Sequence, residues 1–302
     1  MKKIILTLTA AAVLGLLGLA GCAGLGKAIE QALAITDEKI TQIQTTAPLE
    51  KQYSQMGRYA VASAKFDAQD KELKTYTVYY PQTGSNYPLI VMANGSGTPV
   101  SKYEPVLKHL ASHGFVVIGS EELSSWRGTG AAKSLDFALA QNRNQNSVLF
   151  NKINADKIGV SGHSQGGAGA INLAMKQPNS HLVRSLYTAS TTRGEGEMNL
   201  FDFAPWQVDK PYFAVTSNGA FDKNAAPISK MQDNLRKMPS TNAVVAERKG
   251  LDHGAMLYAA NGYMTAWFLY TLNNDAQARQ VFIGQNAELY RNANWQNVRA
   301  KN

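Results

Sequence analysis

The sequence DKIGVSGHSQGG, residues 156–167, decides how the rest of the chain is interpreted. A short apolar run ends in the pattern Gly-x-Ser-x-Gly, with Ser164 at its centre, and small residues open a helical pattern directly after it. This arrangement is typical of a nucleophile elbow, a sharp turn from a strand into a helix that presents a serine above the edge of a sheet. Gly162 and Gly166 leave room for the strained backbone of such a turn. The stretch therefore predicts an α/β fold with Ser164 exposed at the end of a strand.

Segments of strand length and of helix length alternate on both sides of this turn. Runs such as 88–93 are apolar throughout, which is typical of strands that are buried on both faces of a parallel sheet. The pattern predicts an antiparallel outer strand over 72–80, further strands over 88–93, 115–118, 157–160, 182–187, 212–216 and 243–246, and helices over 132–148, 166–175, 228–238 and 255–272. We therefore expect one domain over residues 57–302, built on a doubly wound, mostly parallel sheet flanked by helices.

The first 22 residues have the pattern of an export signal. Two lysines are followed by an apolar segment, and the sequence LAGC at 19–22 ends in Cys22, the single cysteine among 302 residues. This tetrapeptide resembles the lipobox of bacterial lipoproteins, which implies cleavage after a signal peptide at 1–21, lipid on Cys22 and a location in the cell envelope. The alternative is an ordinary signal peptide that contains a cysteine. Residues 22–56 are expected to form a tether and an approach segment.

Composition restricts the partners and cofactors of this chain. The net charge is +8, from 30 basic and 22 acidic residues, but the basic residues are scattered without a run of five or more. That distribution favours a solvated surface over contact with anionic envelope polymers or lipid headgroups. We expect a monomer that binds no nucleic acid. Neither a cluster of histidines and carboxylates nor a phosphate-binding loop is visible, so no metal and no organic cofactor is expected.

A serine nucleophile needs a base, and the order of elements favours His253 among the five histidines. His253 lies in GLDHG, residues 250–254, just after the last predicted strand and so at the carboxyl end of the sheet. The other histidines are placed elsewhere: His109 and His113 at the surface, His163 beneath the elbow with its ring turned from Ser164, and His181 at the opposite end of the sheet.

The base in turn needs a carboxylate, and Asp222 has the required place in the chain. It follows the strand at 212–216 on a loop and lies between Ser164 and His253 in sequence. Asp252 adjoins His253 and is not expected to orient its ring, because neighbouring side chains diverge. Asp202 and Asp209 precede the strand, and Asp233 lies inside a helix.

Donors for an oxyanion are expected from two backbone positions. One is the N–H of Gln165, directly after the serine, and the other is the N–H of Ser96, in the glycine-containing loop after the strand at 88–93. An ordinary glycine turn is the alternative interpretation of that loop.

Three motifs in this order, PLIVMANG at 88–95, LASHGFVV at 110–117 and the elbow itself, resemble the α/β-hydrolase superfamily, in particular its bacterial cutinase, polyester-hydrolase and dienelactone-hydrolase-like branch. The resemblance implies a triad of Ser164, Asp222 and His253 with esterase activity. Cutinases of this group carry an aromatic residue at the position of Ser96 and methionine at that of Gln165, so the chain departs from them at both expected donors.

The sequence thus predicts a lipid-anchored, extracytoplasmic serine carboxylesterase that acts on a small or polymeric ester through an acyl-enzyme intermediate. Two alternatives stay open. One keeps the triad in an acyltransferase or amidase acting on an envelope polymer, since one fold and one triad serve many reactions. The other is a non-catalytic binding lipoprotein that retains the hydrolase scaffold.

Overall fold

A computed structural model describes residues 34–191 and 201–301 of the chain. The predicted signal peptide at 1–21 and the predicted lipidation site Cys22 lie outside the described residues. Within the described ranges, no helix is long and apolar enough to cross a membrane.

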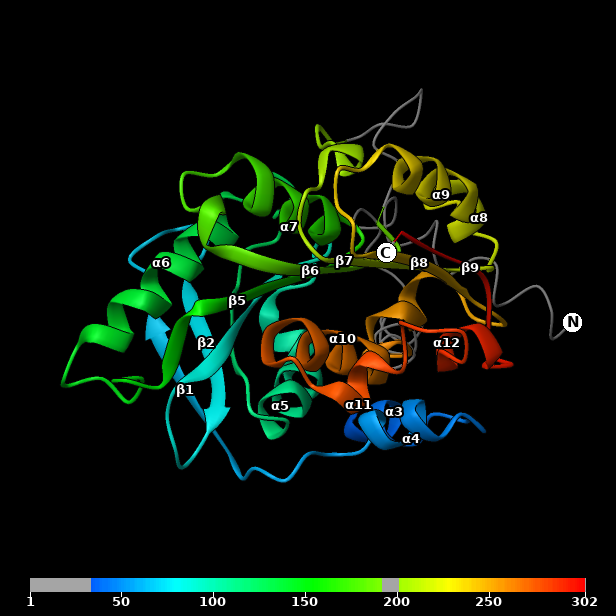
Figure 1. Ribbon diagram of the computed structural model, residues 1–302. Coiled ribbons are helices and arrows are strands. Elements are labelled where there is room, and N and C mark those ends of the chain that lie inside the picture. Colours follow the sequence, from blue (N-terminus) through cyan, green and yellow to red (C-terminus); the bar gives the residue numbers. More distant parts are fainter. Residues whose placement is uncertain (1–33, 192–200, 302) are drawn as a thin grey trace, which may run out of the picture.

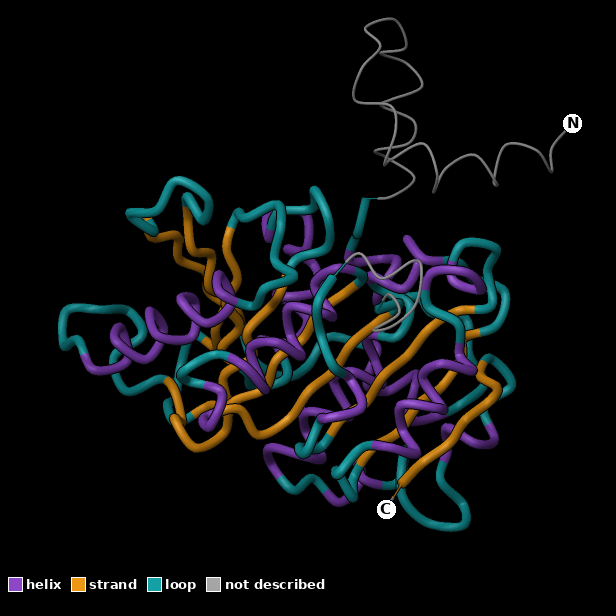
Figure 2. The backbone as a smooth tube through the Cα atoms, turned by 90° about the horizontal axis from the view of Figure 1, so that it is seen from above, coloured by secondary structure: helices purple, strands orange, loops and turns teal. Residues whose placement is uncertain are grey.

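A single nine-stranded sheet forms the centre of the molecule, in the order β1-β2-β4-β3-β5-β6-β7-β8-β9. The six strands from β4 to β8 in this order are parallel, whereas β1, β2 and β9 pair antiparallel at the two edges. Seen from above, the strands lie side by side across the molecule (Figure 2). The strands are β1 (Val61–Asp67), β2 (Thr75–Pro81), β3 (Tyr87–Ala93), β4 (Val116–Ser120), β5 (Ile153–His163), β6 (Val183–Ala189), β7 (Tyr212–Ser217), β8 (Ala243–Arg248) and β9 (Trp295–Lys301).

Helices cover both faces of the sheet (Figure 1). One face carries α6 (Thr129–Arg143), α7 (Gln165–Lys176), α8 (Asp222–Ala225) and α9 (Ile228–Lys237). The other carries α3 (Asp37–Thr41), α4 (Pro48–Ser54), α5 (Glu104–Ser112), α10 (Asn261–Asn273), α11 (Ala276–Arg279) and α12 (Glu288–Arg291). This arrangement confirms the predicted fold class, a mostly parallel sheet between two layers of helices.

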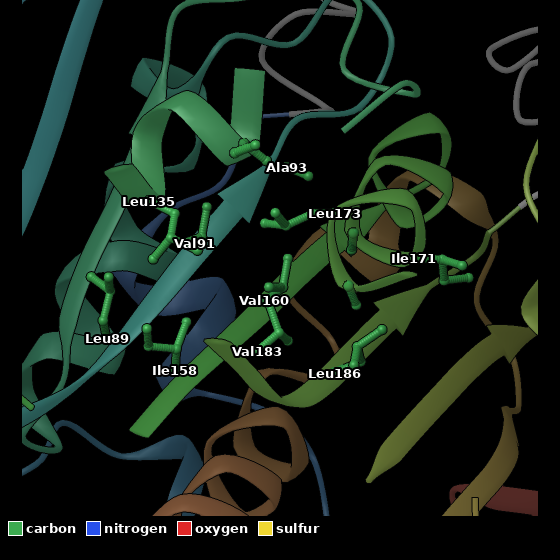
Figure 3. Packing of buried hydrophobic residues seen from close by; sticks show 14 of the residues in the cluster. Leu89, Val91, Ala93, Leu135, Ile158, Val160, Ile171, Leu173, Val183 and Leu186 are labelled. Atoms are coloured by element: carbon green, nitrogen blue, oxygen red, sulfur yellow. The ribbon is translucent and has the colours of Figure 1, made fainter. Parts of the chain in front are cut away.

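The helices on both faces of the sheet explain why the central strands are continuous apolar runs. In β3, Leu89 and Val91 belong to the core beneath α6 and α7 (Figure 3), whereas Ile90 and Met92 belong to the core on the side of α5 and α10. Alternate residues of a strand point to opposite faces, so both sets must be apolar. Full burial of one such side chain contributes about 1.5 to 3 kcal/mol.

The helix α4 is fastened to the last part of the chain by two carboxylates, that of the half-buried Glu288 and that of the buried Glu50. The Glu288 side chain accepts hydrogen bonds from the backbone N–H groups of Leu49 and Glu50, at 2.7 and 2.8 Å. The Glu50 carboxylate, only 1% exposed, accepts from Asn292 Nδ2 and Trp295 Nε1, at 2.7 and 2.8 Å. Part of the predicted approach segment is thus helical and packed on the sheet domain.

Several elements differ from the sequence prediction, among them the helix expected over 132–148, which is α6 (Thr129–Arg143) and ends at Arg143. The edge strands β1 and β9 were not expected. The helix expected over 255–272 begins only at Asn261, because a 3-10 turn over His253–Leu257 precedes α10. This turn starts at His253 and lies between β8 and α10.

Candidate active site

Ser164 is the single residue that joins β5, which ends at His163, to α7, which begins at Gln165. Its backbone has φ 57° and ψ −124°, a conformation that a non-glycine residue rarely adopts. A Cβ on Gly162 would lie 2.1 Å from the carbonyl oxygen of Gly166, and a Cβ on Gly166 would lie 2.1 Å from that of Ala93. The missing side chain of Gly162 therefore lets α7 start directly against the end of β5, and that of Gly166 lets α7 lie against the end of β3.

The side chain of His253 bridges Ser164 and Asp222. Its Nε2 lies 2.9 Å from Ser164 Oγ, and its Nδ1 lies 2.6 Å from Asp222 Oδ1. The three residues follow β5, β7 and β8, whose carboxyl ends lie at one edge of the parallel sheet. The structure brings together the three residues that the sequence singles out for nucleophile, base and acid.

Asp222 is fully buried and surrounded by hydrogen-bond donors. Its Oδ2 accepts from Ser190 Oγ at 2.6 Å, from Ser217 Oγ at 2.5 Å and from the Ser217 N–H at 3.1 Å. Burial alone would raise the pKa of this carboxyl, but the hydrogen bonds from His253, Ser190 and Ser217 outweigh it and hold the pKa below the usual range. The side chain is therefore a carboxylate whose Oδ1 is directed at the histidine ring.

Asp252 braces the backbone of the site and does not contact the ring of His253 in any hydrogen bond of the described chain. Its Oδ1 accepts from the backbone N–H of His253 at 2.8 Å and of Asp222 at 3.2 Å, and its Oδ2 accepts from that of Phe221 at 3.2 Å. This carboxylate fixes the two loops that carry the histidine and the acid.

His163 lies beneath the elbow and hydrogen-bonds to the carbonyl oxygen of His253 through Nε2, at 2.9 Å. The two rings lie 4.8 Å apart. Burial, together with the neighbouring His253, lowers the pKa of His163, so its ring is neutral at physiological pH. The ring supports the backbone of His253 and leaves Ser164 Oγ to the other histidine.

The prediction of a surface position was wrong for His109, which is completely buried. Its Nε2 hydrogen-bonds to the carbonyl oxygen of Gln55 at 2.9 Å, and its Nδ1 to Asn261 Nδ2 at 2.6 Å. Burial lowers the pKa of His109 to about 3. This neutral ring joins α5 to α10 and the segment before β1, away from the serine.

The two expected oxyanion donors lie on either side of the serine turn. Gln165 is the first residue of α7, and Ser96 lies in the loop after β3. Among the hydrogen bonds between residues of the described ranges, neither backbone N–H has an acceptor, whereas the neighbouring Gly95 N–H donates to Tyr103 Oη at 2.9 Å. Within residues 34–191 and 201–301, no acceptor is therefore hydrogen-bonded to either of these N–H groups.

Sequence reasoning missed the residues that surround this triad of side chains. Ser190 directly follows β6, and Ser217 ends β7, so both lie at the carboxyl edge of the sheet. A serine at the end of a parallel strand was the available signal, but serine is common in loops. No group of three or more histidine, cysteine, aspartate or glutamate side chains in the described part of the chain could hold a metal ion.

Comparison with known proteins identifies relatives of this chain. A family model described as "PETase: PET hydrolase-like" matches residues 44–297. Cutinase 1 of Thermobifida cellulosilytica is 25% identical over 219 residues, which cover 68% of this chain and 76% of that protein. Cutinase est2 of Thermobifida alba is 32% identical over 107 residues, so the match spans about a third of each protein, 34% of this chain and 35% of the relative. Because the family model covers most of the sequence, the chain belongs to the PET hydrolase-like family of carboxylic ester hydrolases.

Proposed function

We propose that the chain is a cutinase-like serine carboxylesterase with Ser164 as nucleophile, His253 as general base and Asp222 as the group that orients the base. The observation that carries this proposal is the unbroken path from Ser164 Oγ through both nitrogens of His253 to Asp222, with distances of 2.9 and 2.6 Å. Nucleophile and base within hydrogen-bond reach, with the base held by a third group, is the arrangement that activates a serine.

The proposed reaction has two halves. His253 Nε2 takes the proton of Ser164 while Oγ attacks the ester carbonyl, and the imidazolium then protonates the leaving alcohol. A water molecule next gives a proton to Nε2 and attacks the acyl-enzyme. The imidazolium then returns this proton to Ser164 Oγ as the bond to the acyl group breaks, which releases the acid and the free serine. The buried Asp222 carboxylate fixes the proton of the neutral ring on Nδ1 and stabilises the imidazolium that forms in each half.

The negative charge on the carbonyl oxygen is proposed to meet the N–H groups of Ser96 and Gln165. The Gln165 N–H opens the 12-residue helix α7, where the helix dipole also favours an anion. Donors of this kind that are fixed before the reaction begins are worth about a hundredfold to a thousandfold in kcat each.

The substrate class follows from the relatives. Two of them are named cutinases, and the matching family is described as PET hydrolase-like. We infer that this chain cleaves carboxylic esters, either soluble or presented on a polymer surface. No organic cofactor enters this proposal, because His253 carries every proton transfer, while Asp222 orients its ring and the two backbone N–H groups stabilise the oxyanion.

The cell-envelope location is a separate proposal that depends on Cys22. Attachment of lipid to its sulfur would place the enzyme on a membrane surface, joined by the segment before α3. Metabolic labelling with a fatty-acid analogue should succeed for the wild-type chain and fail for Cys22→Ser. Equal labelling of the two would rule out this anchor and leave an ordinary signal peptide.

The catalytic proposal is tested with a fluorophosphonate probe and short p-nitrophenyl esters. The wild-type protein should react with the probe and hydrolyse the esters, and Ser164→Ala should lose both activities by about a thousandfold or more. Ser101→Ala, an exposed serine on the 3-10 turn before α5, is the matched control and should behave as the wild type. Folded wild-type protein that neither reacts with the probe nor turns over the esters would refute the proposal.

A further inference from the structure

The loop that follows β4, residues 121–125 and called the β4 loop below, is hydrogen-bonded to both sides of the proposed oxyanion hole. The carbonyl oxygen of Leu123 accepts from the Gly97 N–H at 3.0 Å. The Ser125 N–H donates to Gln165 Oε1 at 2.9 Å. One short loop is therefore tied to the residue after Ser96 and to the side chain of Gln165 itself.

The residue two positions before Ser96 is tied to the same loop. Asn94 Nδ2 donates to the carbonyl oxygens of Ser120 and Glu122, at 2.7 and 2.9 Å, and Ser125 Oγ donates to the carbonyl oxygen of Asn94. Asn94 and Ser125 are each only 1% exposed. Asn94, on one flank of Ser96, is thus held by buried hydrogen bonds, whereas Gly97, on the other flank, is held by a bond to the exposed Leu123. Together these bonds form a ring that passes through the β4 loop.

Gln165, the first residue of α7, is also bonded to the β4 loop. Its side chain is buried, and its amide oxygen faces Ser125, while its backbone N–H opens α7 beside the nucleophile. A methionine, which cutinases of the resembling group carry here, offers only a weakly accepting thioether. The departure from the cutinase pattern at Gln165 is therefore matched by a buried partner at Ser125.

Separation of the two donors matters because an oxyanion donor acts only within about 2.7 to 3.1 Å of the charged oxygen. A displacement of about 1 Å can cost on the order of a hundredfold in rate. The N–H groups of Ser96 and Gln165 come from different segments, the loop after β3 and the start of α7, so their spacing depends on what joins those segments. In the described structure, the β4 loop is hydrogen-bonded both to the loop that carries Ser96 and to the side chain of Gln165.

We propose that Gln165 is a positioning residue whose side chain, through Ser125 and the β4 loop, sets the spacing between the two oxyanion donors. The inference rests on the proposed function, since it assigns a role to the side chain of a residue whose backbone is proposed to stabilise the oxyanion. Gln165 here acts through the loop, and its amide oxygen does not touch the substrate.

Substitution of Gln165 by methionine tests this proposal, because it removes the acceptor and keeps the length of the side chain. We expect kcat for p-nitrophenyl butyrate to fall about 30-fold with KM within about twofold. Inhibition by a trifluoromethyl ketone, which forms the tetrahedral oxyanion, should weaken by the same factor. Gln177→Met is the matched control. The side chain of Gln177, which follows the far end of α7, is hydrogen-bonded too, but through Nε2, which donates to the carbonyl oxygen of Arg127 at 2.9 Å.

Ser125→Ala is the second variant, and it keeps the N–H bonded to Gln165 while it breaks the bond to Asn94. We expect kcat to fall about tenfold, and less than additively in combination with Gln165→Met, because both changes open one ring.

Four results would overturn the inference. The first is an equal kcat in Gln165→Met and Gln177→Met. The second is a loss of thermal stability in Gln165→Met without a change in the inhibition constant of the ketone. If Gln165→Met does not fold, Ser125→Ala decides, and wild-type values of kcat and of that constant refute the inference. Wild-type protein that does not react with the fluorophosphonate probe refutes the proposed function first and the inference with it, so the two failures are distinguishable.

Discussion

The substitution Asp222→Asn reverses the direction of the hydrogen bond that reaches His253. Three donors face Oδ2 of Asp222, and one of them, the Ser217 N–H at 3.1 Å, is fixed in the backbone and cannot turn away. The amide oxygen of an asparagine must therefore face these donors, and its NH₂ group must face Nδ1 of His253. The ring then accepts at Nδ1 and carries its proton on Nε2, where it can no longer accept the proton of Ser164.

The expected loss is large because the variant keeps the geometry and removes the base. A triad histidine held in the wrong tautomer loses about 10⁴ in kcat, which corresponds to about 5.5 kcal/mol in the activation barrier. The assay is hydrolysis of p-nitrophenyl butyrate between about pH 6 and pH 10, with kcat and KM measured separately. KM should change little, and thermal unfolding should show that the variant is folded.

Asp252→Asn is the matched control for this substitution. The amide oxygen of an asparagine can still accept from the backbone N–H of His253, which Asp252 Oδ1 accepts at 2.8 Å, and the bond between His253 Nδ1 and Asp222 is untouched. We expect its kcat to stay within about tenfold of the wild type. Near-normal turnover in Asp222→Asn together with an inactive Asp252→Asn would refute the reasoning and identify Asp252 as the acid.

Three further predictions concern stability. Burial, followed by the repulsion of nearby carboxylates, raises the pKa of Glu122 from 4.5 to about 7, so the folded state holds an extra proton between these values and stability falls as the pH rises through them. Glu122→Gln should abolish this fall and stabilise the protein at pH 8 by about 3 kcal/mol. Urea unfolding at pH 5 and pH 8 measures the free energy of unfolding of both proteins, and an equal difference between them at the two pH values would contradict the prediction. Gly162→Ala places a Cβ 2.1 Å from the carbonyl oxygen of Gly166 and should cost at least about 3 kcal/mol in the same assay, whereas a wild-type midpoint would show that the elbow is not so tightly packed. Glu50→Ala leaves Trp295 Nε1 without its acceptor and should cost about 3 kcal/mol, and a loss below about 1 kcal/mol would mean that water replaces the carboxylate.

The central part of the fold could be predicted from the sequence because burial on both faces leaves an unmistakable pattern. Strands such as β3 and β7 consist almost entirely of buried residues, so their apolar runs predict them directly. The edge strand β9 pairs only with β8, and its burial alternates irregularly between buried and exposed residues. A strand with one partner and one open side needs no apolar run, and its sequence resembles a loop.

The candidate site could be predicted as far as the order of elements determines it. Ser164, Asp222 and His253 each follow a parallel strand, and the structure brings their side chains together. The burial of His109 could not be predicted, because its partners Gln55 and Asn261 lie 54 and 152 residues away in sequence. Local pattern records the period of a helix but not which distant groups pack against it.

The carboxylates that fasten α4 to the end of the chain also set an order of events during synthesis. The contacts of Glu50 with Glu288 and Trp295 span 238 and 245 residues, and α4 has only seven residues, too few to be a stable helix alone. A growing polypeptide leaves the ribosome from its amino end, so residues near Glu50 emerge long before their partners exist. α4 therefore cannot dock through these hydrogen bonds until the residues up to Trp295 have been released, and the carboxylate of Glu50 stays hydrated until then.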